Sequence, residues 1–317
     1  MNTTPNFRRW TGATLMMVAS GLGLSTAAGA ASHQIPLRMV GNYAVVNARI
    51  AGHDQPLRLI VDTAAGASAL DSQLIEKLEL IDASAQQAHV SGASGSAHSV
   101  QFARQLEIEM AGSSFAIRPL ATDMSRFGQA HGGSGDYDGI LGNDLLRRYE
   151  VTFDVPGGAL TLSEAESDGA AHPICQANGF GAARPAHLSG FALVELMATA
   201  DNQPAAVEAV VDTGAAQTLF NWRAMDSMGL DRDDMRLRDR AEGTRGFGGQ
   251  RVDSQLFTLS QVRFLDWAVN DLEVRISDLP VFQALGLAEK PAVILGIDAL
   301  QRAPLWISKG VERICIG

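Results

Sequence analysis

Short apolar runs bounded by turn residues recur along the chain, and two of them end at an aspartate. Leu59-Ile60-Val61 leads into Asp62, and Ala209-Val210-Val211 leads into Asp212. Both runs are fully apolar and carry β-branched residues next to the aspartate. This pattern predicts short buried strands rather than amphipathic helices.

A hairpin is predicted in front of each aspartate. Turn residues occur at Asp54-Gln55-Pro56 and at Asn202-Gln203-Pro204, and residues 43–50 and 191–197 have the composition of strands. Each half of the chain is therefore expected to begin with two strands, the second of which ends in Asp-Thr.

The chain contains an internal duplication. Residues 62–80 (DTAAGASALDSQLIEKLEL) and 212–230 (DTGAAQTLFNWRAMDSMGL) align without a gap, with Asp, Thr and Ala at the first, second and fourth places. Asp71 and Asn221 occupy matching places and are good N-caps, so about ten residues of helix are expected after each. The repeat predicts the same architecture in both halves.

Two further landmarks occur in both halves. Ile140-Leu141-Gly142 is matched by Ile294-Leu295-Gly296, and each is followed by a short helical piece and a closing hairpin. Glycine-rich tips at residues 91–95 and 246–249 follow each aspartate at a similar distance, as mobile loops over a site commonly do.

The repeat predicts a mostly β protein of two lobes with a site between them. Residues 31–165 are assigned to an N-terminal lobe and residues 183–317 to a C-terminal lobe. Residues 166–182 are rich in Gly and Ala and are assigned to a linker.

Composition narrows the possible functions. The chain is 46% hydrophobic and 19% charged, which suits sizeable cores, and its formal net charge is −10. Lysine is nearly absent and no strong basic cluster occurs, which argues against nucleic acid and anionic lipid as partners. The seven histidines lack H-E-x-x-H spacing and the two cysteines cannot supply four ligands, so no metal site is expected.

Residues 1–30 have the pattern of a secretory signal peptide. Arg8-Arg9 precede an apolar stretch over 13–24, and Ala28-Gly29-Ala30 is a small-residue cleavage site. A transmembrane anchor is the alternative, but the stretch is shorter than the roughly 20 residues that span a bilayer. Cleavage would remove two positive charges and change the net charge from −10 to −12. We expect an exported protein, periplasmic or secreted, with no stable membrane insertion after cleavage.

The two cysteines, Cys175 and Cys315, form an even set. In an exported protein this suggests one disulfide, provided that the two Cα atoms lie within about 7 Å. Two buried free thiols are the alternative.

Taken together, these features resemble the aspartic proteases. Hydrophobic-Asp-Thr-Gly/Ala-Ala, a glycine-rich tip and a hydrophobic-hydrophobic-Gly are each present twice. The short lobes and the Asp-Thr-Gly-Ala sequence resemble the retropepsin-like bacterial branch, and the resemblance covers roughly residues 36–165 and 183–317. It implies an aspartic endopeptidase in which Asp62 and Asp212 share one catalytic water, without a cofactor or a metal.

The resemblance also implies supporting roles for other residues. Thr63 and Thr213 would lock the two loops together with crossed hydrogen bonds. Gly142 and Gly296 would let the adjacent chain pass closely behind each aspartate loop. Flaps that cover the substrate and exclude water would contain Gly92, Gly95, Gly246 and Gly248.

Two features depart from the family pattern. Ala64 stands where glycine is usual, whereas Gly214 is regular. A methyl group at 64 would cost about 1 kcal/mol or more if the backbone there needs positive φ or a close approach of another chain. Ala65 and Ala215 replace hydroxyl residues that donate to the aspartates in pepsin-like enzymes, and losing a donor raises a carboxyl pKa. We therefore expect activity at mildly acidic or neutral pH.

A rival interpretation is a periplasmic binding or scaffold protein that kept the two-lobed fold and lost proteolysis. A zymogen is a third, although no long pro-segment is visible between Ala31 and the first predicted strand. Because both halves lie on one chain, a monomer can build the whole site. The expected partner is a peptide or protein substrate.

Overall fold

A computed structural model describes Met1 and residues 31–93, 95, 97–125, 137–164, 172–179, 181–185, 190–239, 243–245 and 251–317. The predicted signal peptide, apart from Met1, lies outside the described residues. So do Gly246 and Gly248 of the second predicted flap and residues 166–171 of the predicted linker.

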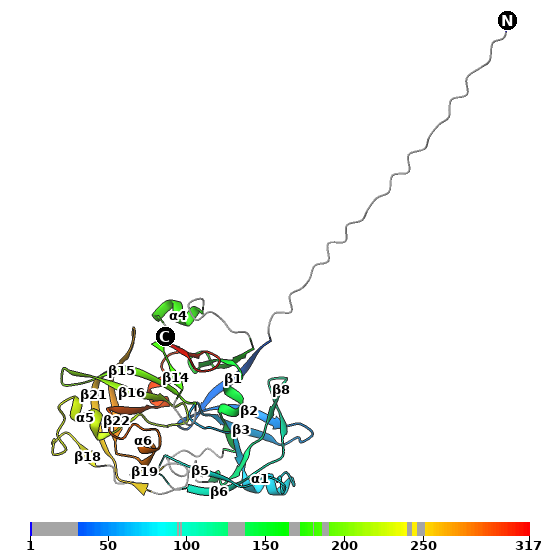
Figure 1. Cartoon of the computed structure of the whole chain (residues 1–317), viewed down its shortest axis with the longest axis horizontal. Helices are drawn as coiled ribbons and strands as arrows, with labels where there is room; N and C mark the ends of the chain where they lie inside the picture. Colours follow the sequence, from blue (N-terminus) through cyan, green and yellow to red (C-terminus); the bar gives the residue numbers. More distant parts are fainter. Residues whose placement is uncertain are drawn as a thin grey trace.

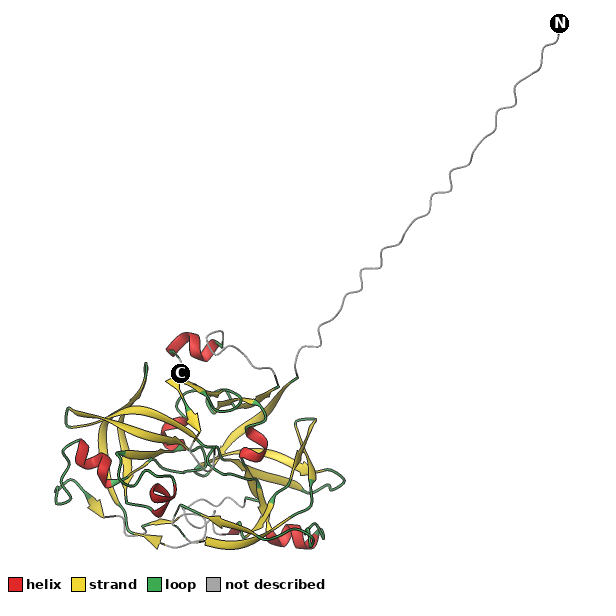
Figure 2. Cartoon of the chain, in the orientation of Figure 1, coloured by secondary structure: helices red, strands yellow, loops and turns green. Residues whose placement is uncertain are grey.

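The described residues form two lobes built mainly of strands, which lie side by side in Figure 2. The prediction of a mostly β, two-lobed protein is confirmed. In Figure 1 the blue and cyan strands of the first half make one lobe, and the yellow and orange strands of the second half make the other.

The N-terminal lobe contains most of one continuous sheet. Its elements are β1 (Ser32–Val40), β2 (Tyr43–Ile50), β3 (Pro56–Val61), β4 (Ala69–Asp71), α1 (Ser72–Lys77), β5 (Ala88–Ser91), β6 (Ala97–Phe102), β7 (Leu106–Met110), β8 (Ser113–Ile117), β9 (Leu120–Thr122), β10 (Gly139–Leu141), α3 (Asn143–Leu146), β11 (Glu150–Asp154) and β12 (Ala159–Ser163). Strands β2, β3, β10, β4 and β9 lie in that order, and β7 pairs with the end of β2. Arg118-Pro119 separates β8 from β9, since proline has no N–H to give to a ladder.

The C-terminal lobe repeats this arrangement. Its elements are β14 (Arg184–Pro185), β15 (Ala192–Ala200), β16 (Gln203–Val211), β17 (Leu219–Phe220), α5 (Trp222–Ser227), β18 (Arg238–Asp239), β19 (Thr244–Arg245), β20 (Arg251–Val252), β21 (Gln255–Phe264), β22 (Trp267–Ile276), α6 (Pro280–Ala284), β23 (Ala292–Leu295) and α7 (Ile297–Leu300). Strands β15, β16, β23, β17, β22 and β21 close into a barrel, because β21 also pairs with β15. Unlike the β8–β9 pair, β22 runs without interruption.

Hydrophobic patterning accounts for both lobes. In β7 the apolar residues Leu106, Ile108 and Met110 are buried and the two glutamates between them are exposed. The all-apolar runs β10 and β23 are buried along their whole length, as central strands should be.

Both predicted N-caps are present, on shorter helices than expected. The Asp71 carboxylate accepts from the backbone N–H groups of Gln73 and Leu74, and the Asn221 side chain accepts from that of Ala224. The helices have six residues each rather than about ten. The chain then turns through left-handed backbone, at Glu79 (φ 55°) and at Gly229 (φ 74°), which ends a helix.

Six strands at one end of the same continuous sheet join the two lobes. They lie in the order β13 (Gly181–Ala182), β25 (Arg313–Ile316), β24 (Leu305–Ile307), β11, β12 and β1, so that β24 of the second half pairs with β11 of the first. The predicted linker contains α4 (Pro173–Asn178) and β13. A disulfide joins Cys175 of α4 to Cys315 of β25, with the Cα atoms 5.3 Å apart.

Candidate active site

The two aspartates leave equivalent strands at the same edge of equivalent sheets. Asp62 follows β3 and Asp212 follows β16, and each of these strands pairs in parallel with the strand before a Leu-Gly landmark. The Asp62 N–H donates to the Leu141 carbonyl (3.1 Å), and the Asp212 N–H donates to the Leu295 carbonyl (3.0 Å). Parallel strands end at a common edge, which brings Gly142 and Gly296 beside the aspartate loops.

Thr63 and Thr213 cross-link the loops of the two lobes. The N–H of each threonine donates to the Oγ1 of the other, at 3.1 Å in both directions. The Thr63 hydroxyl then donates to the Val211 carbonyl (2.8 Å), and the Thr213 hydroxyl donates to the Val61 carbonyl (2.7 Å). Both threonines are buried. These bonds hold the two strand ends that carry the aspartates at one place in the molecule.

Backbone N–H groups orient both carboxylates. Asp62 Oδ1 accepts from Ala64 (2.8 Å), and Asp212 Oδ1 accepts from Gly214 (2.9 Å) and Ala215 (3.0 Å). Asp62 also lies directly against the opposite loop: a Cβ built on Gly214 would be 2.2 Å from Asp62 Cγ. Glycine at 214 is therefore required by the close approach of the carboxyl group.

Burial shifts the proton affinity of the pair. It raises the pKa of Asp62 to about 6, against the opposing effect of the Ala64 and Ala65 N–H groups. Burial, followed by the charge of Asp62, raises the pKa of Asp212 well above its usual range. Because neighbouring carboxylates cannot both ionise cheaply, the pair loses its first proton, from Asp62, at about pH 6 and keeps the second to higher pH.

Ala64 does not strain its loop. Neither Ala64 nor Gly214 has a positive φ, so the backbone conformation at this place does not require glycine. The Ala64 methyl packs against a cluster of the opposite lobe that includes Leu193, Leu219 and Phe282. The backbone cost considered from the sequence is therefore absent in this loop.

Gly142 and Gly296 lie behind the two loops. A Cβ on Gly142 would be 2.6 Å from the Ala67 carbonyl carbon, and a Cβ on Gly296 would be 2.8 Å from the Ala215 carbonyl oxygen. Any side chain at either place would force the adjacent loop backbone to move.

A supporting pair in each lobe was not predicted. Ser68 donates its N–H and its hydroxyl to Asp144 Oδ1 (2.7 and 2.6 Å), and Thr218 does the same with Asp298 (2.9 and 2.7 Å). The two hydroxyls also accept from the N–H groups of the landmark glycines, at 3.0 Å each. The signal was present in the sequence: a hydroxyl residue follows each aspartate by six places, and an aspartate follows each landmark glycine by two.

One supporting bond occurs in the first lobe alone. The Asn143 amide donates to the Thr63 carbonyl at 2.8 Å, whereas the matching residue in the second lobe is Ile297. Tyr43 of β2 was also missed; burial raises its pKa, and Tyr137 and both aspartates add to the shift. This tyrosine therefore lies within electrostatic range of the pair.

The first predicted flap belongs to the hairpin of β5 and β6. Gly92 and Gly95 lie in the segment between these strands, and Gly95 has φ +82°. The corresponding glycines of the second lobe are outside the described residues.

Within the described part of the chain, no group of three or more His, Cys, Asp or Glu side chains is arranged to hold a metal ion. No helix in that part is long and apolar enough to cross a membrane.

Comparison with known families agrees with this geometry. The sequence model of the aspartyl protease family matches residues 46–145 and again residues 196–299. No curated protein matches the chain. The two matched segments cover more than half of the chain, and each contains one aspartate loop and one Leu-Gly landmark. The chain therefore belongs to the aspartyl protease family, in a duplicated, retropepsin-like form.

Proposed function

We propose that this protein is an aspartic endopeptidase that hydrolyses peptide bonds with a water activated between Asp62 and Asp212. The observation that carries the proposal is the crossed pair of threonines, which holds two half-buried carboxyl groups of raised pKa at one place.

The chemistry needs one proton shared by two carboxyl groups. The ionised member takes a proton from water as the water oxygen attacks the carbonyl carbon of the substrate, and the protonated member donates its proton to the carbonyl oxygen. The member that took the proton from water then gives it to the amide nitrogen, and the other member takes a proton from one hydroxyl of the tetrahedral diol. The C–N bond breaks as these protons move. The Ala64, Gly214 and Ala215 N–H groups keep the carboxyl groups oriented throughout.

The raised pKa of Asp62 supports the pH range expected from the sequence. Activity requires one ionised and one protonated carboxyl group. Asp62 loses its proton with a pKa of about 6, whereas burial and the charge of Asp62 keep Asp212 protonated to higher pH. Activity should therefore increase as pH rises through about 6 and fall only at higher pH, as Asp212 loses its proton. A rate profile that peaks below about pH 3, where an ordinary carboxyl group is mostly protonated, would contradict this assignment.

The test is cleavage of a denatured protein across pH, with and without pepstatin. Asp62→Asn and Asp212→Asn should each lower the rate by about 10³-fold or more, because the shared proton and the base are lost together. Asp266→Asn, at an exposed carboxylate in the β21–β22 turn, is the matched control and should have the wild-type rate. Wild-type protein that cleaves nothing at any pH would favour a binding or scaffold protein with the same fold.

We further propose that residues 1–30 direct export and that the mature protein acts as a monomer on a peptide or protein substrate. Both lobes of the site come from one chain, which supports the second point. Amino-terminal sequencing of protein recovered from outside the cytoplasm, together with sedimentation analysis, tests both.

A further inference from the structure

The flap of the first lobe touches the second lobe. The Val281 N–H, in the first turn of α6, donates to the Ala93 carbonyl at the flap tip (3.3 Å). Gly95 lies against Pro280, since a Cβ built on Gly95 would be 2.5 Å from Pro280 Cβ and 2.8 Å from its Cγ. Ala93 also packs against the same apolar cluster of the second lobe that Ala64 contacts. The flap tip and the Asp62 loop are therefore joined to one surface.

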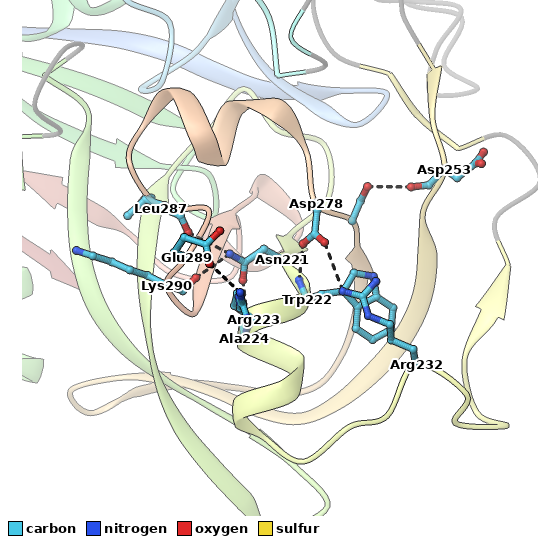
Figure 3. A network of polar contacts seen from close by, with 11 residues as sticks. Asn221, Trp222, Arg223, Ala224, Arg232, Asp253, Asp278, Leu287, Glu289 and Lys290 are labelled. Carbon is cyan, nitrogen blue, oxygen red and sulfur yellow. Dashed lines mark hydrogen bonds and ion pairs between the residues drawn. The ribbon is translucent and has the colours of Figure 1, made fainter.

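Helix α6, which contacts the flap, is held to its own lobe by several hydrogen bonds. Asn221 is 1% exposed, and its amide donates to the Leu287 and Lys290 carbonyls that follow α6 (3.2 and 2.8 Å). Its oxygen accepts from the N–H groups of Ala224 and Ala292, at 3.0 Å each. Figure 3 shows Asn221 beside Leu287, Lys290 and Ala224, below the helix.

A second set of bonds fixes the start of α6. Asp278 accepts from the Trp222 N–H at 2.9 Å, and the Ser277 hydroxyl donates to the Asp253 carbonyl at 2.8 Å. Figure 3 shows Asp278 between Trp222 and Arg232, whose guanidinium lies 3.6 Å from the same carboxylate. Both ends of α6 are thus tied to the barrel of the second lobe.

The flap itself has few such anchors. Strand β5 pairs with β6 and is the last strand on its edge of the sheet, and its four residues are exposed or half-buried. A two-stranded ribbon of this kind is marginal without further packing. Of the two contacting parts, α6 is therefore the one held by more hydrogen bonds to its own lobe.

We propose that α6 is the docking site that holds the first-lobe flap closed over the Asp62 loop, and that Val281 is a positioning residue for proteolysis. The inference rests on the proposed function. With the flap docked, the Ala93 carbonyl is occupied by Val281 and a continuous bridge spans the lobes. An extended substrate chain enters when this contact opens, and the contact re-forms to exclude water during hydrolysis.

A pair of glycines gives a matched test. Gly95 and Gly112 both have φ +82°, but a Cβ on Gly112 would meet nothing within 4 Å. Alanine strains both backbones equally and collides with Pro280 only at 95. Gly95→Ala should lower kcat/KM by about 10²-fold, since a small misplacement of the closing element is enough for such a loss. Gly112→Ala should lower it by less than about threefold, as expected of a change away from the site.

Rescue distinguishes docking from general damage. Adding Pro280→Gly to Gly95→Ala removes the colliding atoms and should restore kcat/KM about tenfold. Titrating the sites with pepstatin counts the folded enzyme, so that a loss of stability lowers the titrated fraction and leaves the rate per site unchanged. Equal losses in the two alanine variants, or no recovery with Pro280→Gly, would overturn the proposal.

A distance measurement tests docking without any catalysis. Ser91 and Gln283 are exposed on the flap and on α6, and both native cysteines are bonded to each other. Ser91→Cys and Gln283→Cys can therefore carry the only two spin labels. We expect one short distance in this protein and in its Gly112→Ala form, and a longer, broader distribution with Gly95→Ala. If wild-type protein cleaves nothing, the proposed function fails and this distance still decides whether the flap docks. An unchanged distance, or a changed distance with an unchanged rate in an active enzyme, contradicts the inference.

Discussion

At position 214 the aspartate loop carries glycine, and the Asp62 carboxyl group lies directly against it. At the matching position 64 the loop carries a methyl group, which packs on the opposite lobe. A methyl group of Ala64 excludes an approach by Asp212 as close as that of Asp62 to Gly214. The two carboxyl groups are therefore placed unequally against loops that have the same backbone course.

The scaffold around them is, by contrast, nearly symmetric. The threonine cross-links have equal lengths in both directions, and Ser68–Asp144 is matched by Thr218–Asp298. Symmetry is thus maintained in the bonds that place the loops and relaxed where the carboxyl groups meet them. Glycine is needed at 214 because the Asp62 carboxyl group of the opposite loop lies against it, whereas alanine at 64 is compatible with the fold.

The largest effect is expected when position 214 also carries alanine, so that both aspartate loops have a methyl group. Gly214→Ala places a methyl group where the Asp62 carboxyl lies and should lower kcat/KM by about 10²-fold or more. Peptide hydrolysis measures this, with pepstatin titration to count folded sites. Wild-type activity in Gly214→Ala would mean that the close approach of Asp62 to residue 214 is not needed for catalysis.

Removing the cross-links should affect both lobes alike. Thr63→Val or Thr213→Val leaves one N–H and one carbonyl of the opposite loop without a partner, at a cost of about 2 kcal/mol or more in the free energy of unfolding. Urea titration should give losses that agree within about 0.5 kcal/mol. Thr→Ser at either place keeps the hydroxyl and serves as the control. Clearly unequal losses of unfolding free energy would show that the two threonines do not contribute equally, although their hydrogen bonds have equal lengths.

The dyad should also make stability depend on pH. Because the folded pKa of Asp62 is raised from 3.8 to about 6, the folded protein keeps a proton that the unfolded chain has lost within this range. The contribution of the pair therefore stabilises the fold at low pH and is lost as pH rises through this window. The melting temperature of Asp212→Asn should fall less between pH 4 and pH 6 than that of Asp266→Asn. Parallel curves for the two variants would contradict the raised pKa values.

The smallest effect is expected for the reverse substitution. Ala64→Gly restores the usual family residue but relieves no strain, since φ at Ala64 is already negative. It should destabilise the fold by about 0.5–1 kcal/mol through chain entropy and leave kcat/KM within about threefold. A large gain in activity would show that the methyl group impairs the site after all.

Much of this architecture could be predicted from the sequence because the repeat carries local signals. Asp-Thr after an apolar run, Asp71 and Asn221 as N-caps, and Leu-Gly before a short helix each fix a local conformation. Two copies of each define the fold class without any knowledge of long-range contacts.

The missing parts depend on contacts between distant residues. Asp144 and Asp298 recur at the same spacing in both halves, but their role becomes visible only when parallel strands bring them beside Ser68 and Thr218. The hydrogen bond from the Val281 N–H to the Ala93 carbonyl joins residues of different lobes, and no periodic pattern in the sequence predicts it. The sequence also leaves open whether the loop at Ala64 needs positive φ, and the closeness of Asp62 to Gly214 is a tertiary contact that no local pattern predicts.

The sheet that joins the lobes has a consequence for folding during synthesis. Strand β11 can pair with β12 as soon as the first half exists, but its other edge waits for β24, about 150 residues later in the chain. Until then β11 is an open edge, the kind of surface on which chains associate wrongly. The bond between Cys175 and Cys315 spans a sequence separation of 140 and closes over the same sheet. We therefore expect the closing of this edge to be a late step in folding, and a folding helper would have most effect before it.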